Sequence, residues 1–337
     1  MQAKWFFTDA NAELDKAAAS FLKSWNTNAP FQIKSSGTTG LPQLYSFNKT
    51  QLTHSALASN AALQLNAQTR ALLCLPLTSV GGLMLLARSV VGNFELVLQL
   101  PSSRPLQNLQ QKIDFVAMVP TQLQQSLQHD QQQLKGIAKI LVGGGQMSSE
   151  LIAACQSAEL EVWHSYGMTE TLSHVALRKV SPVEEPFFHA LPGITFSCQN
   201  DCLVIHYPAL QSQELVTKDI VQLHNTTTFT WLGRSDNAIN SGGFKIIPEI
   251  LETQLHKHLD TAFFITSLPD AIWGQTVAIV MEGKKKPVFP DFQQLGLKTA
   301  ETPRKYALVP HFKRTETQKI KRQEVLQDLT DADWRPI

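Results

Sequence analysis

The chain has 337 residues, of which 43% are hydrophobic and 17% charged, and its formal net charge is +1. This length accommodates one large and one smaller domain, and the charge gives no general attraction to nucleic acid or anionic lipid. No stretch of the sequence comes close to the run of about 18 apolar residues that a membrane span needs, and the N-terminus lacks the apolar run of a signal peptide. We therefore expect a cytoplasmic protein with no membrane span and no nucleic-acid partner.

Short apolar runs alternate with helical patterns through the first two-thirds of the chain. Residues 9–25 suit a helix, Asn48 can cap one that runs to about Leu65, and Ser148 or Ser149 can cap one through Gln156. The expected buried strands are Ala71–Leu75, Phe94–Leu100, Ile113–Val119, Ala138–Val142 and Glu161–His164. This alternation predicts βαβ units with parallel pairing.

The pattern changes after Ser173, where strands follow one another closely and antiparallel pairing is expected as far as Leu232. Beyond Gly233 the elements suit a small α+β domain. They are a helix at Pro248–Leu259, strands at Ala262–Thr266 and Thr276–Met281, and a helix near Phe292–Leu297. We expect an α/β protein with a large domain over 1–234, a small C-terminal domain over 235–337, and a hinge near Asp236.

Hydroxyls and glycines are concentrated at Ser35–Gln43, which reads SSGTTGLPQ. Backbone N–H groups and hydroxyls in such a loop can donate to phosphate oxygens. A Walker loop would end in Gly-Lys-Ser/Thr and open directly into a helix, whereas this segment closes with Gly-Leu-Pro. The segment is compatible with a nucleoside triphosphate held outside a Walker fold, although in isolation an ordinary polar surface loop is the better explanation.

A second segment, His164–Thr171, reads HSYGMTET and follows an expected strand. The ring of Tyr166 could lie against a purine, the hydroxyl of Thr169 could hold a phosphate, and the carboxylate of Glu170 could ligate Mg²⁺. The alternative is a strand-to-loop turn with a solvated glutamate.

Two further segments carry polar groups suited to the same ligand. Asp219 can accept both ribose hydroxyls and Arg234 can approach the same nucleotide, while Gly242-Gly243 permits close backbone approach. Near the C-terminus, Lys319 lies in a basic run and could offset negative charge at an α-phosphate. A polar interdomain turn and a solvated basic face are the plainer interpretations.

Together and in this order, the four segments resemble the adenylate-forming superfamily of acyl-CoA synthetases, luciferases and adenylation domains, over residues 31–325. Within it they are most similar to the short form of the o-succinylbenzoate–CoA ligase family of menaquinone biosynthesis. The residues that carry this similarity are Ile113–Pro120, Tyr166–Thr171 with Ser173 and His174, and Gly233–Gly243.

The resemblance implies a reaction in which an acid and ATP form an acyl-AMP, Mg²⁺ assists, and the CoA thiol then displaces AMP. It implies Lys319, Thr169 and Glu170 as catalytic residues, with Glu170 also the metal ligand and Asp236 the hinge. The implied nucleotide-binding residues are Ser36, Thr38, Thr39, Gly40, Gly144, Gly145, Tyr166, Asp219 and Arg234. The implied acid-binding residues are Arg88, Ser79, Gly167, Ser173 and His174, with Arg88 pairing with the succinyl carboxylate of the substrate.

Several departures from the family pattern limit this transfer. Gln43 stands where the phosphate loop usually ends in lysine, and Gln318 stands where a glycine usually precedes the catalytic lysine. Thr78 and Ser79 replace the phenylalanine and histidine common in such ligases, which affects the aryl pocket more than the fold. Only 34 residues precede the phosphate loop, so most of the usual N-terminal subdomain is expected to be missing.

Two alternatives therefore stay open at this point. The first is a CoA ligase for another aryl or medium-chain acid, with the same mechanism and a different pocket. The second is a degenerate, non-catalytic nucleotide-binding relative, which the shortened N-terminus and Gln43 suggest. The presence of Glu170, Asp219, Arg234 and Lys319 argues against it. In the favoured ligase reading the expected partners are an aromatic carboxylic acid and CoA, and a homodimer is left open.

Overall fold

The computed structural model describes residues 4–8, 11–34, 43–210, 214–259, 261–315 and 319–337. Its contacts divide the chain into two compact units. The first comprises Met1–Ser197, Ile205–Leu215 and His224–Phe229, and the second comprises Cys198–Val204, Val216–Leu223 and Thr230–Ile337. The unit boundaries fall within strands β11 (Thr195–Gln199), β12 (Cys202–His206), β13 (Leu215–Asn225) and β14 (Thr228–Arg234).

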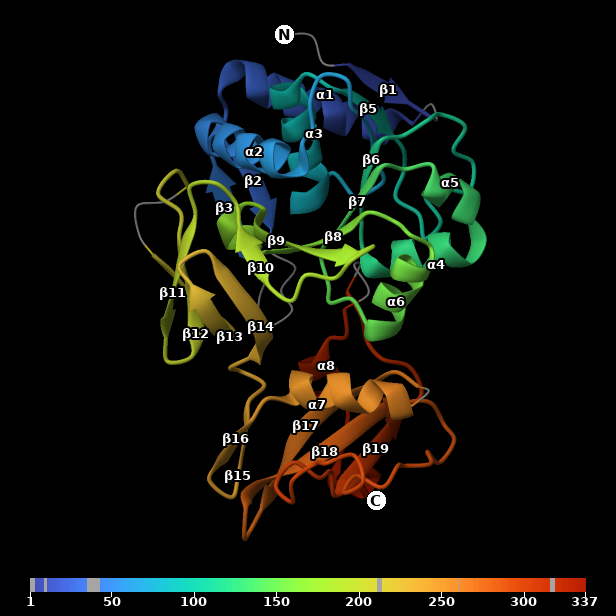
Figure 1. The fold of residues 1–337 in the computed structure, drawn as a ribbon, viewed down its shortest axis with the longest axis vertical. Coiled ribbons are helices and arrows are strands. Elements are labelled where there is room, and N and C mark those ends of the chain that lie inside the picture. The colour runs from blue at the N-terminus through green and yellow to red at the C-terminus, as the bar shows by residue number, and fades with distance from the viewer. Residues whose placement is uncertain (1–3, 9–10, 35–42, 211–213, 260, 316–318) are drawn as a thin grey trace. The chain divides into compact units, whose positions relative to one another are not determined.

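A parallel sheet forms the centre of the first unit (Figure 1). Its strands are β4 (Arg70–Leu73), β5 (Glu95–Leu98), β6 (Phe115–Met118), β7 (Lys139–Val142) and β8 (Val162–Gly167). They lie in the order β5-β4-β6-β7-β8, each neighbour parallel to the next, and β1 (Trp5–Phe7) adds a parallel edge beside β5. The five predicted strands and their parallel pairing are confirmed, with bounds that differ by a few residues.

Helices lie on both sides of this sheet. They are α1 (Ala12–Thr27), α2 (Lys49–Leu63), α3 (Val80–Gly92), α4 (Pro120–His129), α5 (Gln131–Lys135) and α6 (Ser149–Ser157). Figure 1 shows α1, α2 and α3 grouped on one side and α4, α5 and α6 on the other. Leu123 of α4 and Ile152 of α6 share a buried core with Val116 and Ile140 of the sheet. The α/β layering predicted from the sequence is therefore confirmed.

Side-chain caps explain where two of these helices begin. The Asn48 carboxamide accepts from the backbone N–H of Gln51, which starts α2, and the Ser148 hydroxyl accepts from Leu151, which starts α6. Each cap satisfies a donor that the first turn of a helix leaves without a partner. Both predicted helix starts are confirmed, because a cap depends on local sequence alone.

Pairing becomes antiparallel after β8, as predicted. Strand β9 (His174–Ser181) pairs with β8 and with β10 (Phe188–Ala190), and β10 pairs with β14, all antiparallel. The sheet order then continues as β14-β13-β12-β11, where β11 is Thr195–Gln199. A separate hairpin joins β2 (Phe31–Lys34) to β3 (Leu44–Phe47), and the short 3₁₀ helix η1 (Thr169–Thr171) lies between β8 and β9.

The second unit is largely a small α+β assembly. Its sheet has the order β16-β15-β18-β19-β20, and β17 pairs with β18. The strands are β15 (Ile239–Ser241), β16 (Phe244–Ile246), β17 (Phe263–Asp270), β18 (Gly274–Glu282), β19 (Lys305–Val309) and β20 (Arg335–Pro336). The helices are α7 (Pro248–Leu255), η2 (His256–His258), α8 (Arg322–Gln327) and η3 (Asp331–Asp333). Leu251 and Leu255 of α7 pack in one core with Val277 and Ile279 of β18.

One predicted helix, near Phe292–Leu297, is wrong. These residues form a turn in which the Asp291 carboxylate accepts from the backbone of Gln293 and Gln294. Gly296 then takes φ 77°, which ends any helical run. Phe292 and Leu297 are spaced like helical core residues because both are buried, but the turn brings them into the core without a helix.

Among the described residues, no helix combines the length and the apolar character that a membrane crossing requires. The domain boundary at 234/235 and the hinge at Asp236 stay predictions.

Candidate active site

The predicted triphosphate loop joins β2 to β3. Ser36, Thr38, Thr39 and Gly40 lie outside the described residues. The two strands that flank the loop pair in register, with Lys34 opposite Leu44. The assignment of these four residues stays a prediction.

Glu170 lies on η1, directly after β8, and a tyrosine holds its carboxylate. The hydroxyl of Tyr45 on β3 is 2.9 Å from Glu170 Oε1 and 2.7 Å from Gln43 Oε1. One proton serves one acceptor at a time, and an ionised carboxylate is the stronger of the two. Partial burial and the Glu170 charge raise the pKa of Tyr45, so the phenol remains a donor. Tyr45 thus connects the end of the phosphate loop to the predicted metal ligand.

Tyr166 and Gly167 form the end of β8, beside that carboxylate. The Tyr166 ring packs edge-on against Phe229 with centroids 5.1 Å apart, and tilted against Phe188 at 5.9 Å. At Gly167 an added Cβ would lie 2.3 Å from the carbonyl oxygen of Ser173, so only glycine permits this approach of β8 to β9. Two of the sequence-predicted residues therefore fix the shape of the loop between the strands.

The loop between β8 and β9 is held in a constrained form. Leu172 is fully buried with φ 61°, a left-handed conformation that bulky residues rarely adopt. The hydroxyl of Thr171 donates to the Ser173 carbonyl at 2.7 Å and accepts from the N–H of Met168 at 3.0 Å. The loop that carries Thr169 and Glu170 is thereby fixed to Ser173 and the start of β9.

The Gly143–Gln146 segment follows β7 and contacts the neighbouring strand β8. Gly144 has φ 76°, and the carbonyl of Gly145 accepts from His164 Nε2 at 3.0 Å. A Cβ at Gly143 would lie 2.5 Å from Ser165 Oγ. Of the predicted pocket wall, the Gly145 carbonyl is thus held by His164 of β8, while Ser165 of β8 leaves no room for a side chain at the neighbouring Gly143.

Arg88 on α3 is a buried cation, 2% exposed. Its Nη2 donates to Ser173 Oγ at 2.6 Å and lies 3.3 Å from His174 Nδ1. Its Nε is buried with no hydrogen-bond partner in the part of the chain that the structure describes. Burial lowers the pKa of Arg88 to about 10, so the side chain remains charged at neutral pH. Three of the predicted acid-binding residues, Arg88, Ser173 and His174, therefore meet in one cluster.

Ser79, another predicted acid-binding residue, has a structural task. Its hydroxyl accepts from the N–H of Gly82 and donates to the carbonyl of Pro76 at 2.7 Å, so it caps α3. This cap helps to place the helix that carries Arg88. The contact of Ser79 with an acid stays a prediction.

Asp219 lies within the second unit, on β13, with 8% of its side chain exposed. Trp231 Nε1 donates to its Oδ1 at 3.1 Å, and Arg234 Nη1 lies 3.7 Å from the same atom. Arg234 also forms a two-pronged pair with Asp236, through Nε to Oδ1 at 2.9 Å and Nη2 to Oδ2 at 2.8 Å. Arg234 therefore connects the predicted ribose ligand to the predicted hinge residue.

Lys319 belongs to the same charge cluster. Desolvation lowers the pKa of its ammonium group even though the residue as a whole is exposed, Arg234 lowers it further, and Asp219 opposes the change. The second unit thus brings Asp219, Arg234 and Lys319 together, and their contacts with a nucleotide stay predictions.

The segment around Lys319 is anchored on both sides. Its N–H donates to Thr315 Oγ1 at 3.1 Å and its carbonyl accepts from the Thr315 N–H at 2.8 Å. On one side Arg314 pairs with Glu282 at 2.6 Å, and on the other Arg322 pairs with Glu252 at 2.7 Å. Two ion pairs therefore fix the ends of the segment to β18 and α7.

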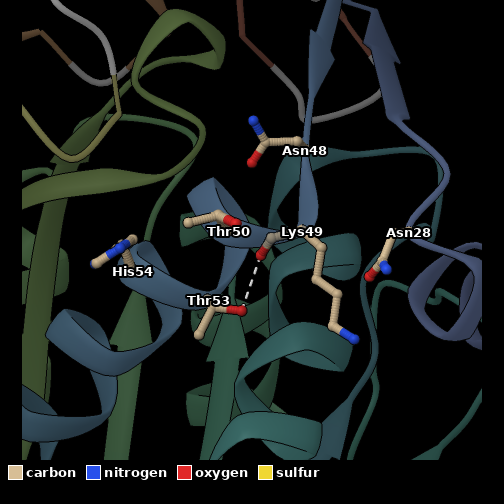
Figure 2. A pocket seen from close by; sticks show the side chains of 6 residues that line it. All are labelled: Asn28, Asn48, Lys49, Thr50, Thr53 and His54. Atoms are coloured by element: carbon tan, nitrogen blue, oxygen red, sulfur yellow. Dashed lines mark hydrogen bonds between the residues drawn. The ribbon is translucent and has the colours of Figure 1, made fainter.

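A pocket of about 430 Å³ opens at the start of α2, away from these residues. Figure 2 shows its polar lining of Asn28, Asn48, Lys49, Thr50, Thr53 and His54. None of the predicted site residues that the structure describes lines it.

Three contributors were missed by the sequence analysis: Tyr45, Ser59 and Trp231. Tyr45 stands two residues after Gln43, and alternation along β3 could have placed both on one face of the strand. Trp231 lies three residues before Arg234, but nothing in the sequence indicated its bond to Asp219. Ser59, whose hydroxyl is 2.9 Å from His174 Nε2, carries no signal in the sequence.

Comparison with known proteins agrees with the fold and the motif order. A family model described as AMP-binding enzyme matches residues 25–198, more than half of the chain. The protein belongs to this family.

Two curated relatives are similar to this chain over most of its length. The chain is 24% identical over 340 residues to 2-succinylbenzoate–CoA ligase of Listeria innocua serovar 6a, covering 90% of this chain and 71% of the relative. It is 26% identical over 328 residues to the enzyme of the same name from Bacillus subtilis strain 168, covering 86% and 67%.

Two solved structures have the same fold. The crystal structure of an acyl-CoA synthetase (AMP-forming)/AMP-acid ligase II-like protein from Dyadobacter fermentans is 33% identical, covers 96% of each chain and gives a TM-score of 0.65. O-succinylbenzoate coenzyme A synthetase from Bacillus subtilis, in complex with ATP and magnesium ion, is 23% identical, covers 88% of this chain and 69% of that one, and gives 0.77. The predicted adenylate-forming ligase fold is confirmed.

Proposed function

We propose that this protein is an AMP-forming acid–CoA ligase that converts 2-succinylbenzoate, CoA and ATP to 2-succinylbenzoyl-CoA, AMP and pyrophosphate, in menaquinone biosynthesis. Family membership and the relatives named 2-succinylbenzoate–CoA ligase support this assignment. A cytoplasmic location is part of the proposal, because ATP and CoA are cytoplasmic metabolites.

The observation that carries the choice of acid is the buried Arg88. A buried charge is expensive unless it is paired, and no carboxylate of a described residue pairs with it. Ser173 and His174 are neutral acceptors and do not balance the charge. A substrate with a second carboxylate would supply the missing anion, as 2-succinylbenzoate does and a simple aryl or fatty acid does not. We therefore place at Arg88 the carboxylate that is not activated.

Activation requires charge stabilisation at the α-phosphate while an acid oxygen attacks and pyrophosphate leaves. In our proposal Lys319 supplies that positive charge, and Thr169 donates a hydroxyl to the same phosphate. Asp219 accepts from the ribose hydroxyls, and its burial beside Trp231 holds the carboxylate in one orientation. Arg234 helps to hold the nucleotide while it remains paired with Asp236.

The donor set fits a magnesium ion that the substrate helps to bind. Mg²⁺ is usually held by one or two protein carboxylates together with substrate phosphates and water. Among the described residues no group of three or more ligating side chains is arranged to hold a metal alone. Glu170 would supply the protein ligand, held by Tyr45. When bound, the ion would neutralise charge on the phosphates.

The second half-reaction requires the CoA thiol to reach the acyl carbon and displace AMP. In our proposal the backbone turn at Asp236 permits the small domain to withdraw Lys319 and to present Gly242-Gly243 instead. Gly242 has φ 57°, and a Cβ there would lie 2.3 Å from the Trp273 ring, so this turn depends on glycine.

The test supplies ATP, Mg²⁺ and CoA with 2-succinylbenzoate, benzoate or octanoate in parallel and measures AMP release. We expect release with 2-succinylbenzoate that exceeds release with either other acid at least about tenfold, the effect of one charge-assisted hydrogen bond. A clear preference for another acid would overturn the substrate assignment and leave the family unchanged. Turnover of no acid, despite ATP binding, would overturn the enzymatic proposal.

A further inference from the structure

The residues behind Arg88 form a buried polar chain that continues beyond Ser173. His174 is 7% exposed and Ser59 of α2 is fully buried. Ser59 Oγ lies 2.9 Å from His174 Nε2, on the side of the ring opposite to Arg88. The chain runs Arg88–His174–Ser59 and joins α3, β9 and α2.

The hydrogen bonds determine the tautomer of His174. A guanidinium only donates, so Nδ1, 3.3 Å from Arg88 Nη2, must accept. In a neutral ring the proton then lies on Nε2, which donates to Ser59 Oγ. Burial and the Arg88 charge lower the pKa of His174 well below its usual value, which agrees with a neutral ring. Both ring nitrogens are engaged, so the imidazole has no group left for a substrate.

The backbone of Arg88 is fixed from the same helix. The carboxamide of Asn60, next to Ser59 on α2, donates to the Arg88 carbonyl at 3.0 Å. The Nη2 group is held by Ser173 and His174, while Nε has no partner. One edge of the guanidinium is therefore tied to the protein, which limits the orientations in which the rest can meet a carboxylate.

We propose that Ser59 and His174 are positioning residues for acid specificity: through the Nη2 edge they hold Arg88 in the orientation that binds the second carboxylate of the acid. This role rests on the proposed function. His174, expected from the sequence to contact the acid, acts instead through Arg88. Loss of the pair should weaken the binding of a dicarboxylic acid selectively, without altering the chemistry at the activated carboxyl.

Kinetics of His174→Leu, His174→Gln and Ser59→Ala test this role. The acids are 2-succinylbenzoate and its two monocarboxylic analogues, 4-oxo-4-phenylbutanoate and 2-butanoylbenzoate, one of which keeps the carboxyl to be activated. For His174→Leu we expect KM for 2-succinylbenzoate to rise about tenfold, with kcat and the KM of the reactive analogue within about twofold of wild type. A glutamine amide can accept from Arg88 and donate to Ser59, so His174→Gln should recover most of the loss.

The matched control for Ser59→Ala is Ser126→Ala. Ser126 is a fully buried serine of α4 whose hydroxyl has no hydrogen-bond partner among the described residues, so its removal should leave every KM unchanged. An equal rise in KM for the dicarboxylic acid and the analogue, or no rise for either, would overturn the positioning role.

A readout without turnover separates this inference from the proposed function. The ¹⁵N NMR shifts of the His174 ring in the ligand-free protein should report a neutral ring at pH 6 with its proton on Nε2. The shift of Nδ1 should change in Arg88→Met, because that nitrogen loses its donor. A ring that is protonated at pH 6, or that carries its proton on Nδ1, overturns the inference even if the enzyme activates 2-succinylbenzoate. The expected shifts support the Nε2 tautomer that the inference requires even if wild type activates none of the acids tested.

Discussion

Replacing Arg88 with methionine removes the buried charge and keeps a side chain of similar length. Burial lowers the arginine pKa from 12.5 to about 10, so at neutral pH, below both values, the folded protein holds a cation at a cost of about 3 kcal/mol. The substitution relieves that cost. It also leaves Ser173 Oγ and His174 Nδ1 without their donor, which costs about 1–3 kcal/mol. The two effects nearly cancel.

We therefore expect the ligand-free Arg88→Met protein to unfold within about 2 kcal/mol of wild type, since an apolar replacement for a buried charge is often neutral. Binding should change far more. A charge-assisted hydrogen bond contributes about 1.5–3 kcal/mol, so kcat/KM for 2-succinylbenzoate should fall about 10–150-fold. Activity on the reactive monocarboxylic analogue should stay within about twofold.

Urea denaturation measures the first quantity and AMP release at a range of acid concentrations measures the second. Thermal denaturation gives a further test of binding at Arg88, because 2-succinylbenzoate should raise the melting temperature of wild type and not of Arg88→Met. Two results would show that Arg88 is mainly structural. One is an equal loss of activity toward 2-succinylbenzoate and the reactive analogue, and the other is a fall of more than about 4 kcal/mol in the free energy of unfolding of the ligand-free variant.

Four other expectations follow from the site. Lys319→Ala should abolish acyl-AMP formation, measured by ATP–pyrophosphate exchange, and largely spare thioester formation from presynthesised acyl-AMP; equal loss of both would contradict its assigned role. Asp236→Pro should do the reverse, because proline fixes φ in a backbone turn that must change, and normal overall turnover would argue against a hinge there. Tyr45→Phe removes the hydrogen bond to Glu170 and should raise the Mg²⁺ concentration needed for half-maximal ATP binding about tenfold, as measured by equilibrium titration. An unchanged Mg²⁺ dependence would refute that link. Acidification from pH 7 to pH 5 should lower the free energy of unfolding by about 2 kcal/mol through His164, because burial lowers the pKa of this histidine to about 4. Between these pH values the unfolded chain takes up a proton at His164, below about pH 6.5, while the folded chain does not. His164→Asn should lose that part of the pH dependence in urea denaturation.

Local sequence determined the parts of this protein that depend on near neighbours. Caps such as Asn48 and Ser148 mark helix starts, and buried apolar runs mark the parallel strands, because a cap or a strand period needs only a few adjacent residues. The order of four polar segments indicated the chemistry. Where local spacing was ambiguous, at Phe292–Leu297, the prediction failed, since burial in a turn and burial on a helix give the same pattern.

Only the tertiary structure decided which polar groups work together. Along the chain, Ser59 lies 115 residues from its partner His174, and Arg88 lies 86 residues from the same histidine. No local pattern links such residues, because their meeting depends on how α2, α3 and β9 pack. The same holds for Tyr45 and Glu170, which are 125 residues apart. The sequence alone therefore determined the family and indicated candidate reacting groups. Packing determined that a buried arginine has no acid partner among the described residues and that His174 lies against it.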